Sequence, residues 1–323
     1  RCVMTIAGSD SGGGAGIQAD LRTFTALGVH GTSALTAITA QNTVGVTAVC
    51  ALEAEMVVAQ VDAVVSDMEI HAVKTGMLAR PHTISAIARL AAHGRLPQLV
   101  VDPVLVSSTG HALMEEGGAQ AYRDELLPHA LVTTPNLREA AVLTSTDVRD
   151  IRSVSDMIAL AHAVLEFGSK YVVLKGGHFD ESSDRATEAP DLLVSRHGDV
   201  VLPAERVITN NDHGTGCSLA AAITAYLGRG HDLETASLIS MFTDAQADPG
   251  DVVYGTDPAA PAAQVATAVT VAVLATAIAA GETDPEVLSN LGVALGEELV
   301  ESVLDIIEAN KAMSHQEFLL PHD

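Results

Sequence analysis

The stretch Thr209-Asn-Asn-Asp-His-Gly-Thr-Gly-Cys-Ser-Leu-Ala-Ala-Ala-Ile223 joins a glycine-containing turn to a helix of small residues. Gly214 and Gly216 lack the Cβ atoms that would keep a ligand away from the main chain. The helix that begins near Cys217 directs free N–H groups, and the positive end of its dipole, at this turn. The stretch, with Thr215 between the two glycines, therefore predicts an anion-binding site that could hold a phosphoryl group during its transfer.

Cys217 lies at the N-terminus of the predicted helix, where the pKa of a thiol is lowered. A thiolate at this position could accept a proton, which predicts Cys217 as a catalytic base. The alternative is a glycine turn beside a buried structural cysteine. The rest of the chain has to distinguish these two interpretations.

The amino-terminal region has a second glycine-rich loop. The pattern predicts a short buried strand over Val3–Ile6, a loop over Ser9–Gly16 and a helix from about Ile17. The loop lacks the Gly-Lys-Ser/Thr of a P-loop and the G-x-G-x-x-G spacing of a dinucleotide site. Its small residues would let a flat ring lie against the backbone, and Asp20 could accept a hydrogen bond from a substrate amine or hydroxyl. The alternative for Asp20 is a first-turn carboxylate favoured by the helix dipole.

Polar residues follow several other predicted strands. Ligands gather at the carboxyl ends of strands in parallel α/β sheets, so Asp102, after the apolar strand Leu99–Val101, is a candidate for orienting Mg²⁺ or its waters. The oxygens of Asn136 and Glu139 also suit Mg²⁺, although an ordinary helix cap is the alternative. Lys175 closes a buried strand, where its ammonium could meet triphosphate oxygens.

Two candidate substrate contacts lie between these elements. A predicted strand over Ser33–Thr39 leads to Gln41, whose carboxamide offers one acceptor and two donors to a polar ligand edge. Met77 could form a soft wall for a substrate ring, or could simply belong to the core. Farther along, the pattern predicts a surface loop over Asp180–Pro190 and a hairpin over Leu192–Leu202.

The composition limits the partners of the chain. The 323 residues carry a formal charge of −24, from 41 acidic and 17 basic residues. This charge opposes binding to nucleic acid or to an anionic membrane. Three cysteines without paired spacing suit a reducing cytosol. The absence of a signal-peptide pattern after Arg1 adds to the expectation of a cytoplasmic protein.

A family resemblance extends from about Val3 to about Gly230. The blocks that carry it are Thr5-Ile-Ala-Gly-Ser-Asp-Ser-Gly-Gly-Gly-Ala-Gly-Ile-Gln-Ala-Asp20, Ala40-Gln-Asn-Thr43, Lys74-Thr-Gly-Met-Leu78, Val101-Asp-Pro-Val104, Thr134-Pro-Asn-Leu-Arg-Glu139, Lys175-Gly-Gly-His178 and His213-Gly-Thr-Gly-Cys217. Together they resemble the hydroxymethylpyrimidine/phosphomethylpyrimidine kinases of thiamine biosynthesis, which are members of the ribokinase-like superfamily. Seven blocks in this order are more specific than any single block.

The resemblance implies a ribokinase-like three-layer α/β/α sandwich with a mostly parallel central sheet. It implies ATP and Mg²⁺, and two successive transfers, first to 4-amino-5-hydroxymethyl-2-methylpyrimidine and then to its monophosphate. The site residues expected on this basis are Gly214, Thr215, Gly216, Cys217 and Lys175 for catalysis; Gly8, Asp20, Gln41, Met77 and Val104 for the substrate; Lys175, Thr209 and Asn136 for the nucleotide; and Asp102 and Glu139 for the metal.

The carboxyl-terminal region departs from the family pattern. We expect a kinase domain over 1–245, followed by an atypical acidic and helical region over 246–323 that either completes the fold or forms an appendage. Helices are predicted over about Pro261–Ala280 and Glu297–Lys311. The uncharged run Ala259–Gly281 is mostly Ala with Thr and Gln, which favours a buried or oligomer-forming helix over a membrane span. A homodimer is expected.

Two other functions remain open at this level. Pyridoxal kinase is the nearest alternative, because a hydroxymethyl group on a flat nitrogen ring requires the same kind of site. A non-catalytic pyrimidine-binding sensor is the other, with the carboxyl-terminal helices as its output. The combination of Lys175, the glycine turn and Cys217 favours an enzyme, since binding alone requires no base beside an anion site.

Overall fold

The computed structural model describes residues 1–42, 44–106, 113–177, 190–202, 214–233 and 236–237. Several sequence predictions lie outside these residues. They are the surface loop before Pro190, the nucleotide contact Thr209, His213 and the whole region 246–323 with its two predicted helices.

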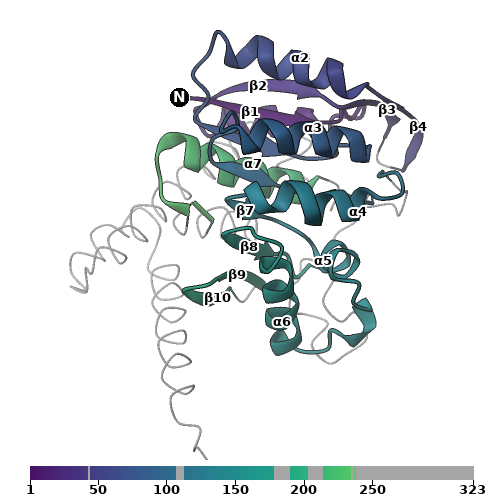
Figure 1. The fold of residues 1–323 in the computed structure, drawn as a ribbon, viewed down its shortest axis with the longest axis vertical. Helices are drawn as coiled ribbons and strands as arrows, with labels where there is room; N and C mark the ends of the chain where they lie inside the picture. The colour runs from purple at the N-terminus through teal and green to yellow at the C-terminus, as the bar shows by residue number, and fades with distance from the viewer. Residues whose placement is uncertain (43, 107–112, 178–189, 203–213, 234–235, 238–323) are drawn as a thin grey trace, which may run out of the picture.

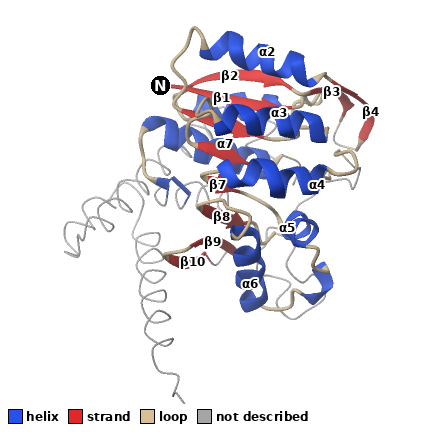
Figure 2. Ribbon diagram, in the orientation of Figure 1, coloured by secondary structure: helices blue, strands red, loops and turns tan. Residues whose placement is uncertain are grey.

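The core of the fold is one eight-stranded sheet with the order β10-β9-β8-β7-β6-β5-β1-β2 (Figure 2). The strands from β2 to β8 in this order are parallel, and β9 and β10 add an antiparallel edge. Their bounds are β1 Cys2–Ala7, β2 His30–Leu35, β5 Ala72–Thr75, β6 Leu99–Val101, β7 Val132–Thr133, β8 Tyr171–Leu174, β9 Asp191–Ser195 and β10 Gly198–Leu202.

Helices cover both faces of the sheet (Figure 1). Helices α1 (Gly16–Ala26) and α7 (Thr215–Arg229) pack on one face. The opposite face is covered by helices that include α2, α3, α5 and α6. The bounds on that side are α2 Ala54–Val65, α3 Pro81–Ala92, α4 Gly118–Ala121, a π-helical turn Tyr122–Leu126, short 3₁₀ turns at Leu127–His129 and Val148–Asp150, α5 Leu137–Thr144 and α6 Val154–Leu165.

The alternation of side chains along the strands produces these two cores. In β1, Val3 packs with α1 and α7, whereas Met4 and Ile6 pack with α2 and α3. In β5, Ala72 and Val73 divide in the same way. Strands buried on both faces read as continuous apolar runs, which is why the pattern predicted them. The predicted three-layer α/β/α sandwich is confirmed.

The predicted strand over Ser33–Thr39 is wrong in one respect, because it is two strands. Thr36 ends the run in the main sheet: its N–H donates to Ala7 O at 3.0 Å and its hydroxyl to Met77 O at 2.5 Å. β3 (Ala37–Gln41) then leaves the sheet and pairs antiparallel with β4 (Val46–Ala51). An apolar run alone gives no sign of this change of partner. The predicted hairpin over Leu192–Leu202 is confirmed as β9 and β10.

The parallel strands all end at one edge of the sheet, and this edge collects the predicted site residues. Gly8 follows β1, Gly76 and Met77 follow β5, Asp102 follows β6 and Lys175 follows β8. Within the part of the chain that the structure describes, no helix has both the length and the apolar character needed to cross a bilayer.

Candidate functional site

The start of α7 is the centre of this edge. Gly214 is the residue before the helix and has φ of 89°, a conformation that favours glycine. A Cβ atom added to Gly214 would overlap the carbonyl oxygen of Gly14, and one added to Gly216 would lie 2.9 Å from Lys175 Nζ. The two glycines therefore allow the turn to contact the amino-terminal glycine loop and Lys175, while its N–H groups point away from the helix.

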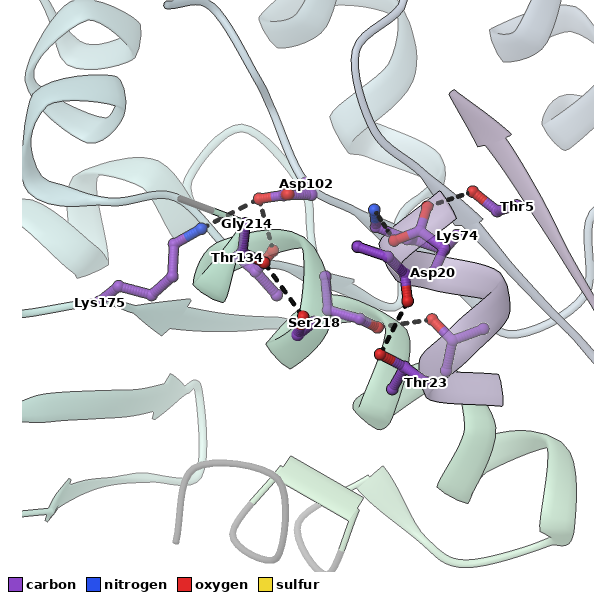
Figure 3. Close-up of polar contacts among 12 residues, drawn as sticks. Thr5, Asp20, Thr23, Lys74, Asp102, Thr134, Lys175, Gly214 and Ser218 are labelled. Atoms are coloured by element: carbon purple, nitrogen blue, oxygen red, sulfur yellow. Dashed lines mark hydrogen bonds and ion pairs between the residues drawn. The ribbon is translucent and has the colours of Figure 1, made fainter. Parts of the chain in front are cut away.

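One ion pair beside this turn joins two strand ends. Lys175 Nζ lies 3.1 Å from Asp102 Oδ1, and Thr134 donates its hydroxyl to the same oxygen at 3.1 Å (Figure 3). Asp102 is 2% exposed as a side chain and Lys175 is 15% exposed. Burial lowers the pKa of Lys175, but the negative charges of Asp102 and Glu139 outweigh it, so the net pKa is raised. The ammonium therefore stays charged and keeps some open surface.

A second ion pair lies deeper. Lys74 Nζ is 2.7 Å from Asp20 Oδ1, with both side chains 0% exposed, and Thr5 donates its hydroxyl to Asp20 Oδ2 at 2.6 Å (Figure 3). Thr5 and Lys74 are register partners on adjacent strands, and they face α1, which carries Asp20. Both oxygens of Asp20 are engaged inside the protein, so its direct bond to a substrate stays a prediction.

No role was predicted for Lys74, although the residues around it contained the signal that was used for Lys175. The chain has only four lysines, and this one is followed and preceded by residues of a buried strand. The argument that selected Lys175, a lysine in an apolar strand, applies equally to Lys74. Burial opposes its charge, but Asp20 raises the pKa of Lys74 well above its ordinary value.

The predicted lowering of the Cys217 pKa is wrong. Cys217 is half-buried, and burial of the thiol raises its pKa to about 11. The positive charge of Lys74 and a hydrogen bond with the Gly16 main chain lower it, but Asp20 and Asp102 act in the opposite direction. Desolvation is therefore the largest influence on the pKa of this thiol, and the carboxylates of Asp20 and Asp102 add to it. The role of Cys217 as a base stays a prediction.

A small apolar surface adjoins the turn. A Cβ atom on Gly8 would lie 2.8 Å from Met77 Cε, so these residues are in close contact. Met77 is 8% exposed and packs with Ala37 and Ala79, and Val104 packs against this group. The structure thus brings together Gly8, Met77 and Val104, which were predicted separately as substrate contacts. Met77 is buried, as the core interpretation expects, and its role as a wall for the substrate ring stays a prediction.

Gln41 lies against the amino-terminal glycine loop. Ser11 donates its hydroxyl to Gln41 O at 2.7 Å and accepts the Gln41 N–H at 2.8 Å, and Thr39 donates to Gln41 Oε1 at 3.3 Å. The loop itself is held by Asp10, a residue without a predicted role. Its carboxylate accepts three backbone N–H groups, those of Gly12, Gly14 and Ala15, at 2.8–3.0 Å. An Asp before a run of glycines is the turn signal that could have identified it.

Asn136 and Glu139 form the helix cap that was the alternative to a ligand role. Asn136 Oδ1 accepts the Glu139 N–H at 2.9 Å, and Glu139 Oε2 accepts the Asn136 N–H at 2.9 Å. Burial raises the pKa of Glu139 to about 7, with Lys175 lowering it and Asp102 raising it. Two carboxylates that repel each other suit a divalent cation, which binds one or two carboxylates together with waters and phosphate oxygens. Within the described ranges, no group of three His, Cys, Asp or Glu side chains could hold a metal by itself.

The fold and this edge define a ribokinase-like small-molecule kinase. A family model described as phosphomethylpyrimidine kinase matches residues 10–240. The chain belongs to the phosphomethylpyrimidine kinase family. The hydroxymethylpyrimidine/phosphomethylpyrimidine kinase of Rhizobium meliloti (strain 1021) is 52% identical over 70% of this chain and 82% of that protein. The corresponding Salmonella typhimurium enzyme is 40% identical over 79% of this chain and 95% of its own length.

Solved structures give the same architecture. Phosphomethylpyrimidine kinase from Clostridium difficile 630 has 40% identity and a TM-score of 0.64, covering 75% of this chain and 96% of that one. Pyridoxal kinase from Bacillus subtilis, in an ADP complex, has 35% identity and a TM-score of 0.67, covering 75% and 89%. These findings confirm the predicted family, fold and enzyme class.

Proposed function

We propose that the chain transfers the γ-phosphoryl group of ATP first to the hydroxymethyl group of 4-amino-5-hydroxymethyl-2-methylpyrimidine, and then to the phosphate of that product, in thiamine biosynthesis. The observation that carries this proposal is the meeting of the glycine turn 214–217 with Lys175 at the carboxyl edge of a parallel sheet. Family membership adds the acceptors, because relatives at 40–52% identity have names that specify both.

The phosphoryl group would lie between Lys175 and the N–H groups of the turn. Backbone N–H groups at the start of α7 provide fixed donors for charge that develops during transfer. Lys175 is held by Asp102 at 3.1 Å, so its ammonium is oriented before the substrate arrives. Asp102 and Glu139 would hold Mg²⁺ directly or through waters, and the ion supplies positive charge to phosphate oxygens when bound. Asn136 and Thr209 are the proposed further nucleotide contacts.

The pyrimidine would lie on the other side of the glycine loop. Gly8, Met77 and Val104 form the apolar surface against which a flat ring could stack. Gln41 is held against the glycine loop by Ser11, and its carboxamide can match the donors and acceptors of an aminopyrimidine edge. Asp20 would support pyrimidine binding in one of two ways. It would hold Lys74 in place, or it would share one of its oxygens directly with the substrate.

Cys217 is the proposed base of the first transfer. The hydroxymethyl oxygen attacks the γ-phosphorus, its proton passes to the sulfur, and the bond from the γ-phosphorus to the bridging oxygen of ADP breaks. The thiolate form is a minor population at neutral pH, because the pKa of Cys217 is raised to about 11. Each thiolate that forms is correspondingly more basic.

Pyridoxal phosphorylation is the second candidate. Pyridoxal kinase from Staphylococcus aureus, in complex with the ATP analogue AMP-PCP and pyridoxal, has 32% identity and a TM-score of 0.67. That score is as high as the score for the pyrimidine kinase. The backbone therefore does not separate the two acceptors.

The test offers the purified chain ATP·Mg²⁺ with hydroxymethylpyrimidine or with pyridoxal, and follows ADP and the phosphorylated products. We expect formation of the pyrimidine monophosphate and then the diphosphate. Turnover of pyridoxal alone would replace the proposal with the second candidate. If ATP is consumed neither with hydroxymethylpyrimidine nor with pyridoxal, both candidate functions are contradicted.

The proposed setting is a cytoplasmic homodimer. Light scattering of the purified chain across a range of concentrations measures the mass, and a mass near 33.3 kDa would contradict the dimer.

A further inference from the structure

Asp10 lies in the loop between β1 and α1 and is 3% exposed. Its Oδ1 accepts the N–H of Gly12 at 2.8 Å, and its Oδ2 accepts the N–H groups of Gly14 and Ala15 at 3.0 Å and 2.9 Å. Hydrogen bonds from N–H groups to a carboxylate are about twice as strong as those between neutral groups. One buried side chain therefore sets the direction of several peptide groups in this loop.

The bond to Ala15 determines where the carbonyl group of Gly14 points. In a planar trans peptide, the C=O of one residue and the N–H of the next point in opposite directions. Because the Ala15 N–H points at Asp10, the Gly14 carbonyl points away from it. Gly214 lies on that side, since a Cβ atom added to Gly214 would overlap Gly14 O. The oxygen therefore occupies the place where a side chain at position 214 would begin.

The preceding peptide group has the same arrangement. The Gly14 N–H points at Asp10, and the carbonyl oxygen of Gly13 accepts a hydrogen bond from Arg22 Nη1 of α1 at 2.6 Å. Two consecutive carbonyl groups thus point outward from one carboxylate, the first at α1 and the second at the start of α7. Asp10 orients both of them.

Gly214 has described contacts on two sides. Its carbonyl oxygen accepts the Ser218 N–H at 3.0 Å and the Ser218 hydroxyl at 3.1 Å (Figure 3). Its Cα meets the Gly14 carbonyl on the other side. The N–H groups that follow Gly214 are the proposed donors to the phosphoryl group, and a displacement of about 1 Å in a catalytic site costs about 100-fold in rate. The place of Gly214 therefore matters for transfer.

We propose that Asp10 is a positioning residue for phosphoryl transfer, which acts through the carbonyl group of Gly14 on the turn at Gly214. The inference rests on the proposed function and adds to it a residue that acts without touching the reacting atoms. Asp10 orients the loop, the loop limits where Gly214 lies, and Gly214 sets the place of the N–H groups at the start of α7. If Asp10 only stabilised the loop, its removal would not change how the turn tolerates a side chain at position 214.

The kinetic test compares Asp10→Asn and Asp10→Ala with wild type for both acceptors. Asn retains one of the two acceptor oxygens, whereas Ala retains neither. We expect kcat to fall about tenfold in Asp10→Asn and about 100-fold in Asp10→Ala. The KM for hydroxymethylpyrimidine should change less than about threefold, because Ser11 still holds Gln41. An unchanged kcat in Asp10→Ala would overturn the inference, and so would a rise in KM alone.

Asp147→Ala is the matched control. Asp147 also accepts a backbone N–H within a turn, that of Arg149 at 3.0 Å, but it is exposed and precedes the 3₁₀ turn Val148–Asp150. Its kcat should stay within about twofold of wild type. A fall as large as in Asp10→Ala would show that the loss of any such turn reduces turnover, and would overturn the inference.

A second measurement tests the contact without using activity. Gly214→Ala presses a methyl group against the Gly14 carbonyl, which Asp10 prevents from moving aside. In an Asp10→Ala background this carbonyl can move. The fall in urea midpoint that Gly214→Ala causes should therefore be at most about half of its value in the wild-type background. Gly230→Ala has open space around it, so its effect should be equal in the two backgrounds.

Equal effects of Gly214→Ala in both backgrounds would overturn the inference. If Asp10→Ala does not fold, Asp10→Asn replaces it, with the effect of Gly214→Ala again expected to be smaller than in wild type. A wild-type chain that phosphorylates neither acceptor would refute the proposed function, and the urea measurements would still decide whether Asp10 holds the turn.

Discussion

The two lysine–aspartate pairs that flank the start of α7 have the same chemistry and different surroundings. The Lys74–Asp20 pair is 0% exposed on both sides, whereas the Lys175 side chain of the other pair is 15% exposed. A dry pair fixes the packing of two layers, because neither charge can be left alone there. A pair with an open ammonium can also contact a ligand. The comparison teaches that burial, more than residue type, separates a supporting lysine from one that is able to contact a ligand.

The position of each lysine in its strand explains this difference. Lys74 lies inside β5 (Ala72–Thr75) and points at the face that α1 and α7 cover. Lys175 comes directly after the last residue of β8 (Tyr171–Leu174), where the sheet ends. A shift of two residues relative to the last residue of the strand separates the ammonium in the core from the ammonium at the sheet edge.

The largest expected effect is on stability, from Lys74→Met. The variant leaves Asp20 buried without its cation, which should cost about 3–5 kcal/mol of unfolding free energy. Urea denaturation at neutral pH measures it. The matched variant Lys74→Met with Asp20→Asn removes both charges and keeps an acceptor for Thr5, so most of the loss should be recovered. A loss below about 1 kcal/mol in the single variant would show that the pair is not structural.

Lys175→Met should affect activity more than stability. We expect both transfers to fall about 100- to 1000-fold, as for loss of one donor to a developing charge. The loss of unfolding free energy should be smaller than in Lys74→Met, because Thr134 still donates to Asp102 and the site is partly open. Steady-state rates and urea midpoints, measured on the same samples, compare the losses of activity and stability in the two lysine variants. Equal stability losses in the two lysine variants would remove the distinction between the pairs.

The turn between the two pairs is tested by Gly214→Ala, with Gly230→Ala as its control. Both glycines flank α7 with positive φ, 89° and 98°, so each substitution should cost about 1–2 kcal/mol in backbone strain. Only Gly214 has the carbonyl of Gly14 in the way, whereas the space around Gly230 is open. Gly214→Ala should therefore cost about 1–3 kcal/mol more and reduce turnover, while Gly230→Ala should leave turnover near wild type. Equal behaviour of both would show that the contact with Gly14 is unimportant.

The smallest effect is expected from pH. A base acts in its deprotonated form, and the pKa of Cys217 is raised to about 11. The kcat/KM for the hydroxymethyl acceptor should therefore rise about tenfold per pH unit between about pH 7 and 9. Transfer to the phosphate acceptor should lack this slope, and so should the first transfer in Cys217→Ser. If kcat/KM for the hydroxymethyl acceptor reached a plateau below pH 8, the raised pKa of Cys217 would be contradicted.

Much of the site could be predicted from the sequence because its residues follow strands. Apolar runs identified β1, β6 and β8, and the carboxyl ends of parallel strands meet at one edge, where the structure places Lys175 Nζ 3.1 Å from Asp102 Oδ1. The hairpin pair β3 and β4 could not be predicted in this way. Its separation from β2 depends on the hydrogen bonds of Thr36 with Ala7 and Met77, which are distant in the sequence.

The sequence by itself determined the α/β class, the glycine turn before α7 and the family, because strand periodicity and glycine spacing are local properties of a chain. Only the tertiary structure decided the electrostatics. Asp20 lies 54 residues from its partner Lys74, and 73 residues separate Asp102 from Lys175. The charge on Cys217 depends on how these groups pair and on how much water packing excludes. Coulomb energy and desolvation depend on distance in space, which no local pattern contains.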